Sequence, residues 1–241
     1  MRRTPELLIL TAIVALQFIS CRAQASAIHD AIKNKDEKLA IQLIEERPKL
    51  YVNSRSKGES TPLHWTAVYN LPQTARLLIN AGALVDSRAD NGSTPLHWAA
   101  RRNTAAIAEL LLSHGASADA KTAKGYTPMH WAAIGNSSAV AEVLIKHGAN
   151  VNAKGDEGVT PLHWAVRKEA YEVMALLIEA DADIFAESVG GATPFYWIRN
   201  RRTREKFEAL IAKREERLAK KQPVEPVEKE PVVVKSEEKK D

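Results

Sequence analysis

A five-residue motif occurs five times in this chain, and each copy begins 33 positions after the previous one. The copies start at Thr61, Thr94, Thr127, Thr160 and Thr193; four read Thr-Pro-Leu/Met-His-Trp and the last reads Thr-Pro-Phe-Tyr-Trp. A constant period of this length indicates one supersecondary unit stacked on itself. Function is then expected along a surface that several units share, because the sequence signals no single catalytic pocket.

The second motif copy and its surroundings predict two helices in each unit. Residues 91–93 have the composition of a turn, and Thr94 can cap a helix that begins at Pro95. A second, longer helix is predicted over 105–113, where apolar residues recur at helical spacing. Gly115 is free to close that helix in a left-handed conformation.

These residues resemble the ankyrin repeat, whose hallmark is T-P-L-H-x-A followed by G-A-D-V-N. The second signature is visible at Gly82–Asp86, Gly115–Asp119 and Gly148–Asn152. The resemblance covers residues 26–213 and implies an all-α solenoid of helix-turn-helix units with short hairpin loops, capped at both ends. The implied units are a degenerate N-terminal capping repeat over 26–57, repeats over 58–90, 91–123, 124–156 and 157–189, and a C-terminal capping repeat with an extended charged helix over 190–221.

The first 25 residues are interpreted as an export signal. Two arginines precede an apolar run over 7–19, which is shorter than the roughly 20 residues of a membrane span. Cleavage after Ala25 would release a soluble protein, whereas Phe18–Cys21 resembles a bacterial lipoprotein box that would lipidate Cys21, the only cysteine. The expected location is therefore periplasmic, membrane-anchored through lipid, or secreted. The repeats themselves can hold no disulfide and no catalytic cysteine.

The charged residues are unevenly distributed along the chain. Residues 26–198 hold 17 Lys and Arg against 19 Asp and Glu, whereas residues 199–241 hold 14 against 10. The basic character thus belongs to the ends, and nucleic-acid binding is not expected. Residues 222–241, rich in Pro, Glu and Lys, are predicted to be a disordered tail.

Four histidines, one per motif, raise the question of a metal site. Stacked helices lie about 8–10 Å apart, whereas the ligands of one zinc ion lie about 2 Å from it. No metal and no cofactor is therefore expected. The resemblance implies instead that each histidine fixes its turn by hydrogen bonding.

All five tryptophans occupy the last position of the motif. One interpretation is a structural ladder that supports the hairpins; another is that their edges form part of a binding surface, and both can hold for one side chain. Trp98 shares a helix face with Arg101 and Arg102, and the resemblance implies that these two positions line a concave groove. The candidate partner-binding residues are Tyr69, Trp98, Arg101, Arg102, Tyr126, Trp131, Ile134, Trp164, Arg167 and Lys168.

The predicted function is a non-catalytic protein–protein interaction scaffold of the cell envelope or secreted fraction, acting as a monomer. An alternative is a structural or protective envelope lipoprotein that stabilises an exported enzyme or a membrane complex. A further alternative is that the groove charges only keep this face soluble. An enzyme is not expected, because the sequence has no Gly-rich phosphate loop, no H-E-x-x-H and no G-x-S-x-G.

Overall fold

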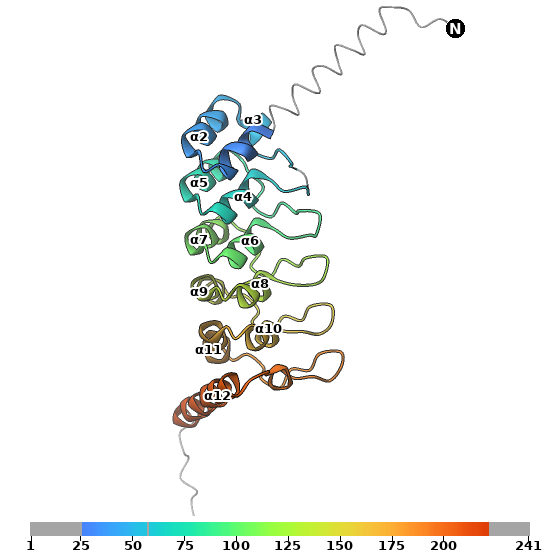
Figure 1. Cartoon of the computed structure of the whole chain (residues 1–241). Coiled ribbons are helices and arrows are strands. Elements are labelled where there is room, and N and C mark those ends of the chain that lie inside the picture. The colour runs from blue at the N-terminus through green and yellow to red at the C-terminus, as the bar shows by residue number, and fades with distance from the viewer. Residues whose placement is uncertain (1–25, 57, 222–241) are drawn as a thin grey trace, which may run out of the picture.

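The computed structural model describes residues 26–56 and 58–221, which form a rod of stacked helix pairs with a row of hairpin loops along one side (Figure 1). The inner helices, next to the hairpins, are α4 (Pro62–Tyr69), α6 (Pro95–Arg102), α8 (Pro128–Gly135) and α10 (Pro161–Arg167). The outer helices are α5 (Pro72–Asn80), α7 (Ala105–Ser113), α9 (Ser138–Lys146) and α11 (Tyr171–Glu179). These described ranges contain no strand, and the predicted all-α solenoid is confirmed.

Local sequence chemistry sets the helix ends, and the predicted start at the motif proline is found in all four inner helices. Each inner helix begins at the motif proline, directly after a Thr with extended backbone. Asn103 ends α6 in the left-handed region, with φ of 57°. The helix predicted over 105–113 is α7, and Gly115 follows it with φ of 84°.

The first and last units depart from this pattern. The first contains a helix over 26–33, then α2 (Glu37–Glu46), and its longer connection folds into the short helix α3 (Pro48–Tyr51). In the last unit the inner helix is reduced to a four-residue 3-10 turn, η1 (Pro194–Trp197). The reason is that Tyr196 replaces the motif histidine and cannot form the cap that starts the other inner helices.

Small residues let the inner helices approach one another closely. Ala99, Ala132 and Ala165 are fully buried between successive units. At Gly135, near the end of α8, an added Cβ would lie 2.7 Å from the Arg101 carbonyl oxygen. A larger residue there would push α6 and α8 apart, so this glycine is needed for packing.

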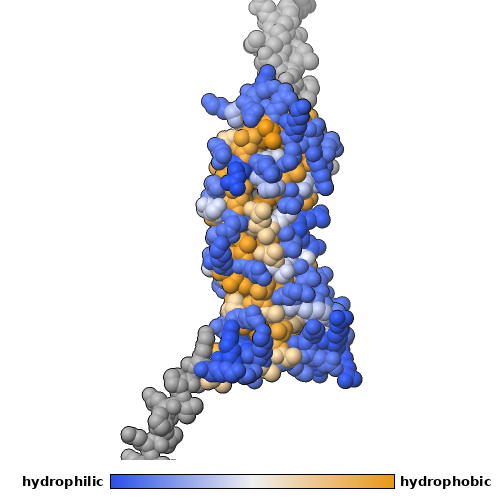
Figure 2. Space-filling view, turned by 90° about the vertical axis from the view of Figure 1, so that its left-hand side faces the viewer, coloured by the Kyte–Doolittle hydropathy of each residue, from blue (hydrophilic) through white to orange (hydrophobic). Residues whose placement is uncertain are grey.

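Figure 2 shows the face of the rod that lies opposite the hairpins and is formed by the outer helices. On this face, apolar surface runs between hydrophilic patches. The rod ends in α12 (Arg201–Lys221), which is anchored on α11 by the buried Phe207. Leu210 and Ile211 of α12 pack against the core, whereas Leu218 is 40% exposed. The reason is length: α12 has 21 residues and α11 only 9, so the last turns of α12 have no neighbouring helix among the described residues.

The predicted signal sequence with Cys21 and the predicted tail over 222–241 lie outside the described residues. Of the helices in residues 26–56 and 58–221, none combines the length and apolar character that a bilayer span requires.

Candidate functional site

A buried histidine cap fixes the start of each full inner helix and joins it to the next unit. In the unit of Thr94, the Thr94 backbone N–H donates to His97 Nδ1 at 3.1 Å. The proton of the neutral ring therefore lies on Nε2, which donates to the Tyr126 carbonyl of the next hairpin at 3.0 Å. The same pair of contacts recurs at His64, His130 and His163.

Burial keeps these histidines neutral. Desolvation, opposed by the hydrogen bond to the next hairpin, lowers the pKa of His64, His97 and His130 to about 4. Both ring nitrogens are engaged in hydrogen bonds. Within residues 26–56 and 58–221, no three His, Cys, Asp or Glu side chains are grouped to hold a metal ion.

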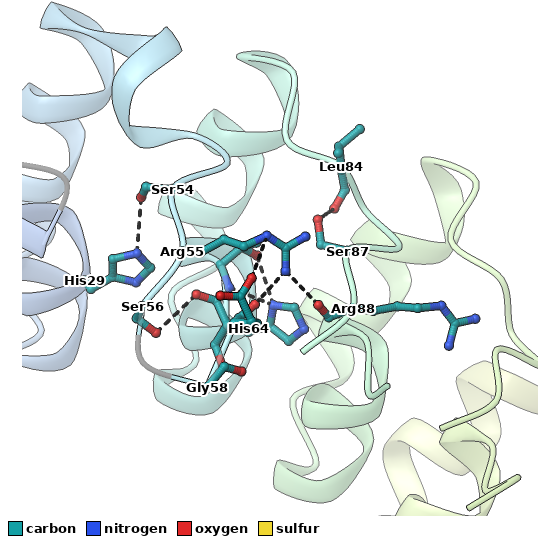
Figure 3. Close-up of polar contacts among 12 residues, drawn as sticks. His29, Ser54, Arg55, Ser56, Gly58, His64, Leu84, Ser87 and Arg88 are labelled. Atoms are coloured by element: carbon teal, nitrogen blue, oxygen red, sulfur yellow. Dashed lines mark hydrogen bonds and ion pairs between the residues drawn. The ribbon is translucent and has the colours of Figure 1, made fainter. Parts of the chain in front are cut away.

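The hairpins are also joined by arginine side chains, as Figure 3 shows for the first two. The Arg55 guanidinium donates to the carbonyl of Glu59 in its own hairpin and to that of Arg88 in the next, both at 2.8 Å. Arg88 repeats the pattern toward Gly92 and Lys121. These two arginines therefore fix the spacing of neighbouring hairpins and are not available to a partner.

The tryptophans form a ladder with the histidines. Three indoles pack edge-on against the imidazole of the preceding unit, with centroids 5.2 Å apart for His64–Trp98, 5.4 Å for His97–Trp131 and 5.2 Å for His163–Trp197. The indole N–H of Trp98 donates to Ser93 Oγ at the base of its hairpin at 2.8 Å. The ladder therefore supports the hairpins, which agrees with the structural interpretation of these residues.

The same indoles leave one edge exposed to a groove. A cavity of about 200 Å³ lies on the inner-helix face, and Trp98, Trp131, Arg101 and Arg102 of the candidate set line it together with Trp65 and Val68. We call this cavity the tryptophan groove. Arg101 and Arg102 are exposed and form no hydrogen bond or ion pair with any described residue. The groove therefore combines aromatic walls with two uncompensated positive charges.

A second cluster of candidates lies toward the end of the rod. The Arg167 guanidinium lies over the rings of Trp164, at 5.7 Å, and Trp197, at 5.3 Å. Lys168 is exposed beside it. This arginine is held in place by the rings, which makes it less adaptable than Arg101 or Arg102.

The remaining candidates, Tyr69, Tyr126 and Ile134, are half-buried. Tyr126 packs between His130, at 5.3 Å, and Trp164, at 5.9 Å, and burial raises the pKa of its hydroxyl. Tyr69 stacks on Trp65, with ring centroids 6.1 Å apart. We consider the two tyrosines mainly as supports of the ladder.

The candidate set omitted two groove residues and one neighbour. Trp65 and Val68 line the tryptophan groove, and the 33-residue period could have identified both from their equivalents Trp98 and Arg101. Lys33 lies 4.5 Å above the Trp65 ring and extends the positive charge of this face. It comes from the degenerate first unit, which carries no motif to predict its position.

Comparison with protein families agrees with this architecture. The chain matches the family described as ankyrin repeats (three copies) over residues 28–122 and again over residues 116–188. The two matches together cover the first four motif copies and the four complete helix pairs, and they end before the fifth copy at Thr193.

Proposed function

Because the chain belongs to the ankyrin repeat family, whose repeats are generally protein–protein interaction modules, we propose that it is a non-catalytic scaffold that holds a protein partner in the tryptophan groove. The observation that carries this proposal is the pairing of exposed indole edges with Arg101 and Arg102, which have no partner among the described residues, around one cavity. Aromatic side chains beside arginine are typical of residues that dominate binding energy at interfaces.

The charges around the groove indicate which side of a partner would face it. The inner helices present Arg101, Arg102 and Lys168, whereas exposed hairpin residues include Asp90 and Asp156. A partner with acidic and apolar side chains would complement the inner-helix side, and a basic edge would complement the hairpins. Such a partner would also be steered into one orientation.

The test reverses the two unpaired charges. Arg101→Glu with Arg102→Glu is expected to weaken capture of the partner from the exported fraction by about 30-fold or more, because removing paired interfacial charges costs about 2–5 kcal/mol. The matched control is Lys38→Glu with Arg76→Glu, which makes the same charge change on the exposed faces of outer helices α2 and α5. Equal capture by both double variants would show that the partner binds elsewhere.

We also propose that the protein is exported, on the basis of its first 25 residues. Its role in the envelope is then that of a binding scaffold, either free or attached through lipid. Attachment through lipid would favour the alternative role, in which the protein stabilises an exported enzyme or a membrane complex. The sequence around Cys21, which resembles a lipoprotein box, supports the lipid-attached form. Intact-mass measurement of the mature protein distinguishes an acylated Cys21 from a free Ser26, and retention of Met1 would contradict export.

A further inference from the structure

The contacts that join each unit to the next stop abruptly at the last unit. Asn152 Oδ1 accepts a hydrogen bond from the Asp183 N–H of the next unit at 2.7 Å, and His163 Nε2 donates to the Ala192 carbonyl at 2.9 Å. One period later these positions hold Phe185, which is 76% exposed, and Tyr196, which is 80% exposed. Two aromatic side chains therefore occupy positions that face the next unit elsewhere in the rod.

The backbone of the last hairpin also has an unused acceptor. Each hairpin donates one backbone N–H to the preceding hairpin; the acceptors are the carbonyls of Gly58, Asn91, Lys124 and Glu157. Gly190 is the next residue in this series, and its carbonyl accepts no hydrogen bond within the described part of the chain. We call the surface formed by Phe185, Gly190 and Tyr196 the end face. Exposed aromatics beside an open acceptor are unusual for a capping unit, which normally presents a polar surface.

Helix α12 leads away from this end face and is strongly basic. It carries nine Lys and Arg against four Glu. It starts four residues after η1 and, at about 1.5 Å per residue, extends about 31 Å from there, toward the side opposite the hairpins (Figure 1). The chain that continues after Lys221 therefore starts at the far end of this helix.

A trough runs along the second half of α12, between this helix and α11. Its volume is about 630 Å³, and it is lined by the apolar Ile178 and Leu210, by the acidic Glu179 and Glu216, and by the basic Lys213, Arg214, Arg217 and Lys220. Arg214 and Arg217 both pair with Asp181, whereas Arg217 Nε is buried without a hydrogen-bond partner among the described residues. The four basic side chains outnumber the two acidic ones of the lining. Lys213 and Lys220 pair with glutamates but are 70% and 73% exposed. Exchanging such surface pairs for another carboxylate costs little.

The sequence that follows matches this path in charge and in length. Residues 222–231 contain three prolines and three glutamates against one lysine. A proline-rich segment favours the polyproline II conformation, in which ten residues span about 31 Å. If it turned back along α12, it would bring its glutamates over the basic trough. The next residues, Val232–Val234, would then reach the end face.

We propose that residues 222–234 of the chain itself dock on α12 and the end face, with Glu225 and Glu228 over the trough and Val232–Val234 against Phe185 and Tyr196. The contact completes the cap that the last unit lacks, and it is independent of partner binding in the tryptophan groove. Residues 222–231 cannot occupy that groove as well, because re-crossing α12 uses their whole length and Trp98 lies three units further along the rod.

Paramagnetic relaxation in the full chain tests this assignment. A nitroxide is attached to Val233→Cys in a Cys21→Ser background, and backbone amide signals are recorded on ¹⁵N-labelled protein. The signals of Phe185, Gly190 and Tyr196 are expected to lose most of their intensity. Those of Gly92 and Gly125, in hairpins far from the end face, are expected to keep theirs.

Charge reversal in the trough provides the matched comparison. Lys213→Glu with Lys220→Glu is expected to restore the end-face signals, whereas Lys38→Glu with Arg76→Glu is expected to leave them broadened. Broadening confined to the last turn of α12, or none at all, would overturn the proposal. Equal broadening of the end-face signals in ¹⁵N protein without a spin label, when it is mixed with spin-labelled ¹⁴N protein, would overturn it too, because the end face would then be covered by a second copy.

Discussion

Lowering the pH from 7 to 5 is expected to destabilise the rod through its buried histidines. The pKa of His29, His64, His97 and His130 is about 4 in the folded chain, against about 6.5 in the unfolded chain. The unfolded state binds these protons more tightly than the folded state. The contribution of these histidines to the free energy of unfolding is therefore fully present above pH 6.5 and falls continuously as the pH drops toward 4.

The size of the effect follows from the pKa differences. One pKa unit corresponds to about 1.4 kcal/mol, so at pH 5 each of these four histidines removes about 2 kcal/mol of stability. Together they remove about 8 kcal/mol, which is comparable with the whole stability of a typical domain, about 5–15 kcal/mol. Protonation also places a proton on Nδ1, where His97 accepts the Thr94 N–H, so the helix cap is lost at the same step.

The variant His97→Gln isolates one of these groups. Glutamine at this position of a capping box can still accept the Thr94 N–H but does not titrate. It is expected to cost about 1 kcal/mol at pH 7, for the lost hydrogen bond to Tyr126. Near pH 5.5 it should reduce the slope of unfolding free energy against pH by about 1 kcal/mol per pH unit.

The assay is denaturant unfolding followed by circular dichroism at several pH values between 5 and 7. Within this window most carboxylates stay ionised, so the histidines dominate the slope. If the unfolding free energy stayed constant from pH 7 to pH 5, the assigned neutral, buried state of the histidines would be wrong. If His97→Gln had the slope of the parent chain, His97 would not be one of the groups responsible.

Two further substitutions, each with a matched control, test the packing. Gly135→Ala should cost about 1–3 kcal/mol, because its Cβ would meet the Arg101 carbonyl oxygen at 2.7 Å. Its control is Gly190→Ala, which should be close to neutral in thermal unfolding because no described atom lies within 4 Å of the added Cβ. Phe207→Ala should cost about 3–5 kcal/mol and expose α12 to limited proteolysis, whereas the exposed Glu208→Ala should not; equal digestion of the two would show that Phe207 does not anchor this helix.

Much of the fold was predictable because local chemistry determines it. The motif places a cap, a helix-starting proline and a core leucine within a few residues, so the inner helices begin where the sequence predicts. The end of α6 at Asn103 and the bounds of α7 depend on the same local preferences. No partner outside the unit is needed to set them.

The side-chain arrangement of the candidate site was less predictable, because its contacts cross between units. Tyr126 has the sequence setting of an exposed turn residue, yet its ring packs on Trp164, 38 positions later. Lys33 lies over Trp65 although its own unit has no motif. The exposed end of α12 depends on where α11 stops, and no local pattern in α12 encodes that.

The joint between neighbouring units has a consequence for how such a chain can change its length. Each motif histidine donates to a carbonyl 29 residues on, and the four receiving residues are Ser93, Tyr126, Val159 and Ala192. Since the acceptor is a backbone carbonyl, the hydrogen bond can form whichever side chain the accepting residue carries. Whole modules of 33 residues can therefore be duplicated or deleted without loss of a hydrogen bond between the remaining neighbours. A single residue inserted inside one module would instead displace the histidine from its carbonyl acceptor.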